Sequence, residues 1–158
     1  MALKLTIYNN QSNAPKPNRP LMPGACAVII NKNREILLHK RADGDVWSLP
    51  GGQMNLGESI SQCLLRELRE ELNINVQIIR LIGIYTSPKV IFEFPNGDVF
   101  QSFVVAFLCK AKNDKITLSQ ESKSFKWIKL YELKKLKTLP FVKEIIADAF
   151  SSNPPTFD

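Results

Sequence analysis

Apolar positions along the chain follow two different periods, and each period predicts a different kind of element. Apolar residues recur at helical spacing from Ile60 to Leu72, so we expect a helix from about Glu58 or Ser59 to Leu72. A second amphipathic pattern predicts a helix over residues 140–150. Runs rich in β-branched and apolar residues predict strands between and around these helices. The expected strands cover residues 3–8, 25–30, 35–41, 76–85, 91–94, 99–110 and 125–130.

Turn-forming residues separate these elements. Residues 31–34 predict a turn, and residues 95–98 (Pro-Asn-Gly-Asp) predict a hairpin, because Asn-Gly between apolar strands is a strong hairpin signal. Residues 15–23 contain four prolines and are expected to form an extended connector. Residues 112–121 are polar and are expected to form a loop. Within residues 103–108 both faces are apolar, which predicts a strand that is covered on both sides.

The order of these elements predicts an α/β fold, in which a mixed sheet lies between the two helices. A chain of 158 residues has the size of one domain. We therefore expect an N-terminal strand and Pro-rich connector over residues 1–24, a single domain over 25–150, and a loose tail over 151–158. Hydrophobic residues make up 44% of the chain and charged residues 23%, which is typical of soluble proteins. No apolar run is long enough for a membrane span, and the N-terminus does not resemble a secretory signal.

Cysteine spacing and net charge bear on the cellular compartment and on the class of binding partner. The three cysteines are far apart and form no metal or redox pattern, so we expect buried free thiols, a reducing compartment and hence the cytoplasm. The net charge of +6 suits a polyanionic partner, either a phosphorylated small molecule or a nucleic acid. Nucleic acid is less favoured, because no aromatic stripe or known module accompanies the lysines that cluster late in the chain. These are Lys126, Lys129, Lys134, Lys135 and Lys137.

Three carboxylates fall on one edge of the first helix, beside its apolar side. At about 100° per residue, Glu67, Glu70 and Glu71 share this edge. Glu67 and Glu71 repel each other as like charges four residues apart, and the last turns of a helix disfavour negative charge. A bound cation would relieve both effects, and magnesium prefers oxygen ligands. The alternative is a solvated acidic face.

The residues around this edge also match a known signature. The spacing resembles the signature of the Nudix hydrolases, with Asn73 in place of the usual glycine at the end of the helix. Asn tolerates the left-handed conformation expected there. The pattern is filled by Gly52, Glu58, Arg66, Glu67, Leu68, Glu70, Glu71, Asn73 and Ile74.

The resemblance implies a Nudix-type α/β/α sandwich and an activity. Nudix hydrolases cleave a pyrophosphate bond in a nucleoside diphosphate linked to another group, with Mg²⁺, or alternatively Mn²⁺, as cofactor. It implies that Glu67, Glu70 and Glu71 are metal ligands and catalytic groups, and that the backbone at Gly51 approaches the metal. It also implies that Glu58 and Arg66 form a structural pair.

Further candidates lie outside this signature. The resemblance implies another catalytic acid from a later loop, for which Glu121 is the first candidate; Glu93 and Asp98 are weaker ones. It also implies that Arg41 meets substrate phosphate. A nucleobase could stack on an aromatic side chain, although each candidate fits a core equally well. These aromatic candidates are Tyr85, Phe92, Phe94 and Phe100. We assign His39, the only histidine, no catalytic role.

The substrate stays open among several alternatives. A nucleoside triphosphate and a nucleotide sugar such as ADP-ribose are equally favoured. The Ser87-Pro88 dipeptide lies downstream of the signature at roughly the distance where ADP-sugar hydrolases carry a proline, although a proline between strands is more often only a turn. An RNA 5′-cap or pyrophosphate hydrolase is an alternative that the positive charge permits. A non-catalytic, nucleotide-binding regulator is a third; it would be indicated by missing signature carboxylates, and none is missing. The oligomeric state is also open, with a homodimer among the alternatives.

Overall fold

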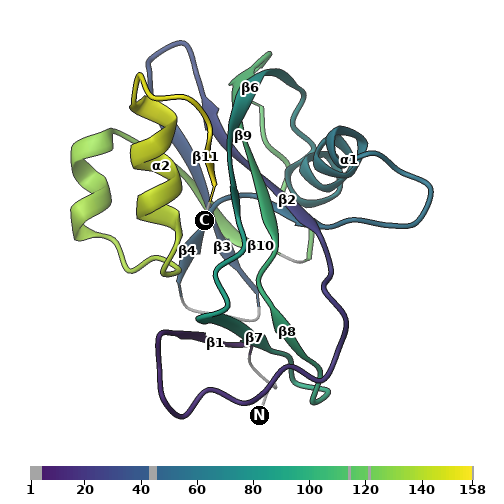
Figure 1. The fold of residues 1–158 in the computed structure, drawn as a ribbon. Coiled ribbons are helices and arrows are strands. Elements are labelled where there is room, and N and C mark those ends of the chain that lie inside the picture. The colour runs from purple at the N-terminus through teal and green to yellow at the C-terminus, as the bar shows by residue number, and fades with distance from the viewer. Residues whose placement is uncertain (1–4, 43–45, 114, 121, 158) are drawn as a thin grey trace.

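A computed structural model describes residues 5–42, 46–113, 115–120 and 122–157, which form two sheets and two α-helices (Figure 1). The strands are β1 (Thr6–Asn9), β2 (Gly24–Ile30), β3 (Ile36–Arg41), β4 (Trp47–Ser48), β5 (Gly51–Gln53), β6 (Val76–Tyr85), β7 (Val90–Glu93), β8 (Val99–Gln101), β9 (Val104–Ala111), β10 (Ser122–Ile128) and β11 (Thr156–Phe157). The helices are α1 (Ile60–Leu72), the 3₁₀-helix η1 (Leu130–Lys135) and α2 (Val142–Phe150).

The main sheet is mixed and is covered on both faces. Its strand order is β10-β3-β2-β9-β6-β11, with β4 beside β3 and β5 beside β2. Helix α1 lies on one face and α2 on the other (Figure 1). The expected α/β/α sandwich is therefore confirmed.

Alternation along the central strands explains the two covered faces. In β2, Ala25, Ala27 and Ile29 pack with the apolar side of α1, whereas Cys26 and Val28 pack with α2. Strand β9 lies between β2 and β6 and also contributes to both cores. The expectation that this strand is covered on both sides is therefore confirmed.

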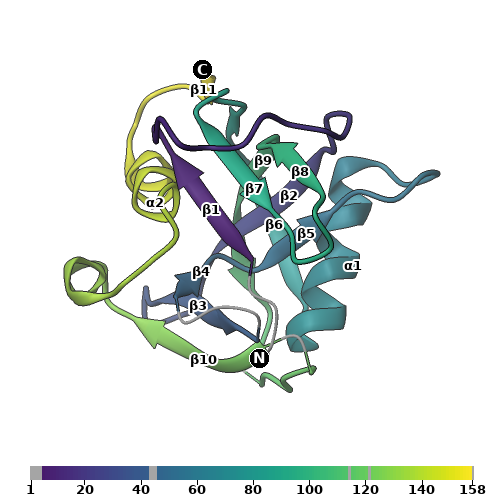
Figure 2. The ribbon, with the colours of Figure 1, turned by 90° about the horizontal axis from the view of Figure 1, so that it is seen from below.

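The predicted strand over residues 99–110 is wrong in one respect, because it is two strands. β8 pairs with β7 in a small sheet of order β1-β7-β8, whereas β9 pairs with β2 and β6 in the main sheet. At the break, the Ser102 N–H donates to Val90 O at 2.9 Å, and Phe103 O accepts from the Gly24 N–H at 2.9 Å. The chain changes sheets here, and the small sheet lies across one end of the molecule (Figure 2).

Both ends of the chain pair with other strands. Strand β1 overlaps the expected strand over 3–8 at residues 6–8 and extends one residue further, to Asn9. It pairs antiparallel with β7. The expectation of a loose tail is wrong for Thr156 and Phe157, because these residues pair in parallel with Gly83 and Ile84 of β6. Since a strand edge offers unpaired backbone groups, even a Pro- and Ser-containing tail can pair there.

The remaining expectations mostly agree with the structure. The hairpin at residues 95–98 forms, with the Phe94 N–H donating to Asp98 O at 2.8 Å. Strand β10 begins three residues before the expected 125–130, and Leu130 already belongs to η1. The three cysteines are free and buried. Within the described ranges, no helix is long and apolar enough to cross a membrane.

Candidate active site

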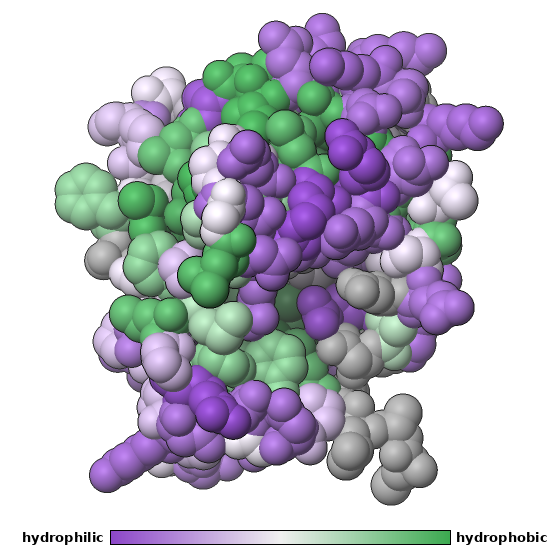
Figure 3. All heavy atoms as spheres, turned by 90° about the vertical axis from the view of Figure 1, so that its right-hand side faces the viewer, coloured by the Kyte–Doolittle hydropathy of each residue, from purple (hydrophilic) through white to green (hydrophobic). Residues whose placement is uncertain are grey.

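One cavity of about 410 Å³ brings the signature residues and aromatic side chains together. Glu67 and Glu71 of α1 line one part of its wall, together with Gly51 and Gly52 of β5. Another part consists of phenylalanines from the small sheet and from the segment that precedes α2. These are Phe92, Phe94, Phe100 and Phe141. The surface that carries α1 is predominantly hydrophilic, with hydrophobic residues gathered below it (Figure 3).

Two glycines allow β5 to lie between β2 and α1. Gly51 has a φ of +144°, and a Cβ at this position would collide with the Ala25 carbonyl of β2. A Cβ on Gly52 would collide with the Glu67 carboxylate. A larger residue at position 51 would therefore push β5 away from β2, and one at position 52 would displace the Glu67 carboxylate of α1.

The same backbone binds the most buried acid among the residues that the structure describes. Glu71 is only 3% exposed, and its Oε2 accepts a hydrogen bond of 2.9 Å from the Gly51 N–H. Glu67 is nearly as enclosed, with 14% of its side chain exposed. Both acids thus lie at the margin of the core, as the position of the acidic edge beside the apolar side predicts.

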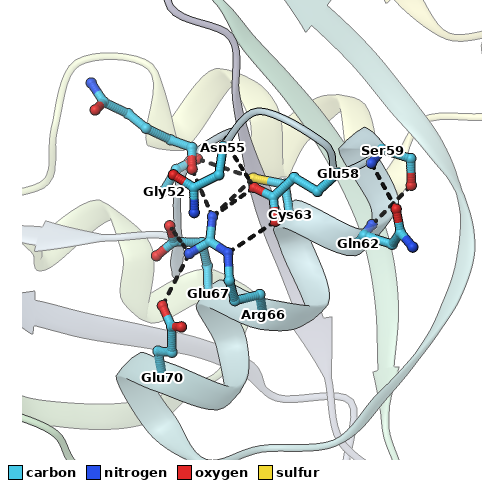
Figure 4. Close-up of polar contacts among 10 residues, drawn as sticks. Gly52, Asn55, Glu58, Ser59, Gln62, Cys63, Arg66, Glu67 and Glu70 are labelled. Carbon is cyan, nitrogen blue, oxygen red and sulfur yellow. Dashed lines mark hydrogen bonds and ion pairs between the residues drawn. The ribbon is translucent and has the colours of Figure 1, made fainter.

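Arg66 joins this edge to the loop before the helix (Figure 4). Its Nε and Nη2 donate to the two Glu58 oxygens at 3.0 and 2.7 Å. Nη1 donates to Glu67 at 2.7 Å and to Glu70 at 3.0 Å, and Nη2 also donates to Gln53 O at 2.9 Å. A single guanidinium therefore contacts three carboxylates and joins the loop to α1.

Electrostatics keep this pair charged. The Arg66 hydrogen bonds, followed by the Asn55 backbone N–H, lower the pKa of Glu58 to about 2. The same Glu58 contact is the main cause that raises the pKa of Arg66. The carboxylate and guanidinium are therefore both ionised at neutral pH.

Helix α1 has a capping residue at each end. Ser59 caps its start in a reciprocal hydrogen-bonding pair with Gln62. Asn73 ends it with φ 50° and ψ 34°, and its N–H donates to the carbonyls of Leu68 and Arg69. The expected left-handed conformation of Asn73 is confirmed, so replacing the usual glycine leaves the end of the helix intact.

The structure separates Glu70 from its neighbour Glu71. The Glu70 side chain is 59% exposed and contacts Arg66, and it does not line the cavity. Consecutive helical residues point about 100° apart, so the two acids cannot both face β5. Glu67 and Glu71, four residues apart, do face it.

The other predicted site residues differ in whether they line the cavity. Arg41, at the end of β3, lines the cavity. Glu121 lies outside the described residues. Glu93 accepts a hydrogen bond of 2.6 Å from the Tyr8 hydroxyl, and Asp98 pairs with Arg19; neither lines the cavity.

Tyr85 and His39 both lie in the core and not in the cavity wall. The Tyr85 ring is buried under α2, where its hydroxyl donates to Asp148 at 2.7 Å, so Tyr85 is not a stacking residue of the cavity. His39 is buried, and its Nδ1 lies 2.8 Å from Ser122 Oγ on the neighbouring strand.

The Ser87-Pro88 dipeptide forms a turn, because the Val90 N–H donates to Ser87 O.

Sequence reasoning missed several residues of the wall. Gln101, Phe103 and Phe141 line the cavity beside the expected phenylalanines. They come from β8, from the connection between β8 and β9 and from the segment before α2, so no local pattern connects them.

The donor set of the cavity fits a hard divalent cation. Glu67 and Glu71 offer carboxylate oxygens beside a close-packed glycine backbone. Among the described residues, no group of three or more His, Cys, Asp or Glu side chains is arranged to hold a metal ion. Magnesium is commonly held by one or two carboxylates together with substrate phosphates, which two acids at a cavity can satisfy.

Known proteins resemble the chain over most of its length. The NUDIX domain family matches residues 20–149. A Bacillus subtilis protein whose name refers to 8-oxo-dGTP diphosphatase activity is 41% identical over 66 residues, which cover 42% of this chain and only 44% of that protein. The RNA pyrophosphohydrolase of Orientia tsutsugamushi is 31% identical over 140 residues, covering 81% of this chain and 86% of that protein. The solved structure of the mutator MutT protein of Bacillus halodurans has a TM-score of 0.65 and 26% identity, covering 87% of each chain.

Proposed function

This chain belongs to the NUDIX domain family of pyrophosphate-cleaving hydrolases, and we propose that it cleaves free nucleoside phosphates with the help of Mg²⁺. The substrate class is a nucleoside triphosphate or a nucleotide sugar such as ADP-ribose. One observation carries this proposal: a single cavity combines a carboxylate pair with a wall of phenylalanines. The first part suits a metal-bound phosphate, and the second suits a nucleobase.

The carboxylate part performs the chemistry. Glu67 and Glu71 would hold the cation beside the Gly51 backbone, whereas Glu70 contacts Arg66 outside the cavity wall. Bound Mg²⁺ or Mn²⁺ would neutralise the substrate phosphates and lower the pKa of a water molecule. Arg66 keeps the Glu67 carboxylate in place through its 2.7 Å hydrogen bond. Arg41, also in the cavity wall, adds positive charge for the phosphates.

The phenylalanine part binds the nucleoside. Phe94 and Phe100 meet edge to face with ring centroids 5.6 Å apart, which gives this wall a rigid aromatic surface. Stacking of a base on an aromatic ring contributes about 1–3 kcal/mol and tolerates different bases. A cavity of about 410 Å³ also lies in the range of small-molecule sites.

A second candidate is hydrolysis at the 5′ end of RNA. The net charge of +6 and the similarity to an RNA pyrophosphohydrolase over 81% of the chain favour it. Four of the five clustered lysines, Lys126, Lys134, Lys135 and Lys137, are exposed and available to a polyanion. The described wall of the cavity contains none of them, which is why we place free nucleotides first.

A phosphate-release assay separates the candidates. The panel contains nucleoside triphosphates, nucleotide sugars, dinucleoside polyphosphates, and RNA with a 5′-triphosphate or cap, each with magnesium and with excess chelator. We expect magnesium-dependent release from a free nucleotide, and loss of release in Glu71→Gln. Release from RNA alone would favour the second candidate. No release from any compound, together with nucleotide binding, would indicate a non-catalytic regulator.

We also assign the protein to the cytoplasm. Three free, buried cysteines support a reducing compartment. Labelling of the thiols in unfolded protein taken directly from cells tests this assignment, and oxidised thiols would contradict it.

A further inference from the structure

The Pro-rich connector between β1 and β2 holds the turn of the β7–β8 hairpin. The Asn18 side chain makes two hydrogen bonds of 2.9 Å, accepting from the Val99 N–H and donating to Gly97 O. The backbone N–H of Asn18 also donates to Val99 O, and Arg19 pairs with Asp98 at 2.6 Å. Four polar contacts thus join this connector to one end of the hairpin.

This hairpin carries the aromatic part of the cavity wall. Phe94 directly follows β7 and Phe100 lies in β8, so the turn held by Asn18 connects the two rings. The far end of the hairpin has its own tie, because the Gln101 side chain donates to Thr86 O at 2.9 Å. The small sheet is separate from the main sheet and lies at one end of it in Figure 1, so these ties help to hold the aromatic wall in place.

We propose that Asn18 is a positioning residue for nucleoside binding, acting through the hairpin that presents Phe94 and Phe100 to the cavity. This inference rests on the proposed function. Asn18 is exposed and does not line the cavity, so it does not touch the substrate itself. Its two side-chain hydrogen bonds restrict the motion of the turn. This preorganises the aromatic wall and lowers the ordering cost of binding a base.

A positioning role predicts a specific kinetic pattern. The phosphate part of the cavity is built from α1 and β5, which Asn18 does not contact. Loss of the Asn18 side chain should therefore weaken contacts to the nucleoside and leave the chemical step almost unchanged. In kinetic terms KM rises while kcat is kept.

The test compares Asn18→Ala with Lys129→Ala in the full chain. Lys129 also makes a surface tie, donating to Asn33 O at 2.8 Å, but it does not line the cavity. The measurements are KM and kcat on the best nucleotide of the phosphate-release panel, inhibition by the nucleoside monophosphate and by inorganic pyrophosphate, and the melting temperature. Binding of the nucleoside monophosphate by calorimetry provides a readout that does not need turnover.

We expect Asn18→Ala to raise KM and the inhibition constant of the monophosphate about five- to tenfold. The inhibition constant of pyrophosphate and kcat should change less than about twofold, and Lys129→Ala should leave all four constants unchanged. Unchanged nucleotide affinity in folded Asn18→Ala, or equal weakening of monophosphate and pyrophosphate, would overturn the inference while normal turnover upholds the proposed function. If the parent protein turns over no nucleotide but Asn18→Ala weakens monophosphate binding, the proposed function fails and the positioning role stands. If the parent neither turns over a nucleotide nor binds the monophosphate, both are overturned.

Discussion

The two parts of the cavity wall are built in different ways. The carboxylate part comes from residues 51–71, a short stretch in which charged hydrogen bonds fix nearly every group. The phenylalanine part comes from residues 92–141, and it is held by ring packing, by the pairing of β7 with β1, and by ties to the connector and to Thr86. Under the proposed function, the chemistry would reside in one local unit and nucleoside binding mainly in the separate small sheet.

Changes in the carboxylates should have the largest effect. We expect Glu67→Gln and Glu71→Gln to lower turnover on the order of a hundredfold or more, because each removes a negative oxygen ligand from the cavity. Glu70→Gln should cost less, because Glu70 is exposed and contacts Arg66. Steady-state rates of the three variants at saturating magnesium check this order. Equal loss in all three would show that Glu70 turns into the cavity during turnover.

The same variants separate function from folding. Replacing Glu71 removes its repulsion with Glu67, about 0.2–0.5 kcal/mol, and an unfavourable helix-dipole interaction of about 0.3–1 kcal/mol. A glutamine oxygen can still accept the Gly51 hydrogen bond. In chelator, Glu71→Gln should thus melt no lower than the parent. A markedly lower melting temperature would make this acid structural.

Arg66→Ala should affect both stability and turnover. It removes every hydrogen bond that joins Glu58, Glu67 and the Gln53 carbonyl, and leaves two enclosed carboxylates without this cation. We expect a lower melting temperature and a turnover reduced together with it. If turnover disappears while the melting temperature stays the same, Arg66 acts directly on the substrate.

The phenylalanine part should change affinity more than rate. Phe100→Ala removes a stacking surface, and a loss of about 1–3 kcal/mol corresponds to a KM raised roughly five- to 160-fold. Phe125→Ala, a partly exposed phenylalanine outside the cavity, is the matched control. A KM that is the same in parent and Phe100→Ala would remove this ring from nucleoside binding.

The smallest expected effect concerns acid stability. Because the pKa of Glu58 is lowered to about 2 from a reference of 4.5, its contribution to stability is complete above pH 4.5 and is lost as the pH falls towards 2. Glu58→Gln should remove this part of the pH dependence. Denaturant unfolding of both proteins between pH 5 and 2 checks it, and parallel curves would contradict the contribution of the pair.

The two parts of the wall also differ in how well the sequence predicts them. Local spacing and residue preferences predict helix α1, its end at Asn73, and the position of Glu67 and Glu71 at the margin of the core. The separation of Glu70 from Glu71 depends on where β5 lies, and this is set by glycine contacts between distant strands. The break between β8 and β9 falls at the polar pair Gln101-Ser102, but such a pair does not show that the chain changes sheets, because this depends on the strands that β8 and β9 pair with.

Manganese binding, measured by electron paramagnetic resonance without substrate, tests the proposed cation site most directly. If Glu67 and Glu71 hold the cation, the parent should bind Mn²⁺, Glu71→Gln should bind it far more weakly, and Glu70→Gln should remain closer to the parent. If Glu71→Gln binds Mn²⁺ as tightly as the parent, the cation is held elsewhere and the carboxylate part of this cavity is not the catalytic centre.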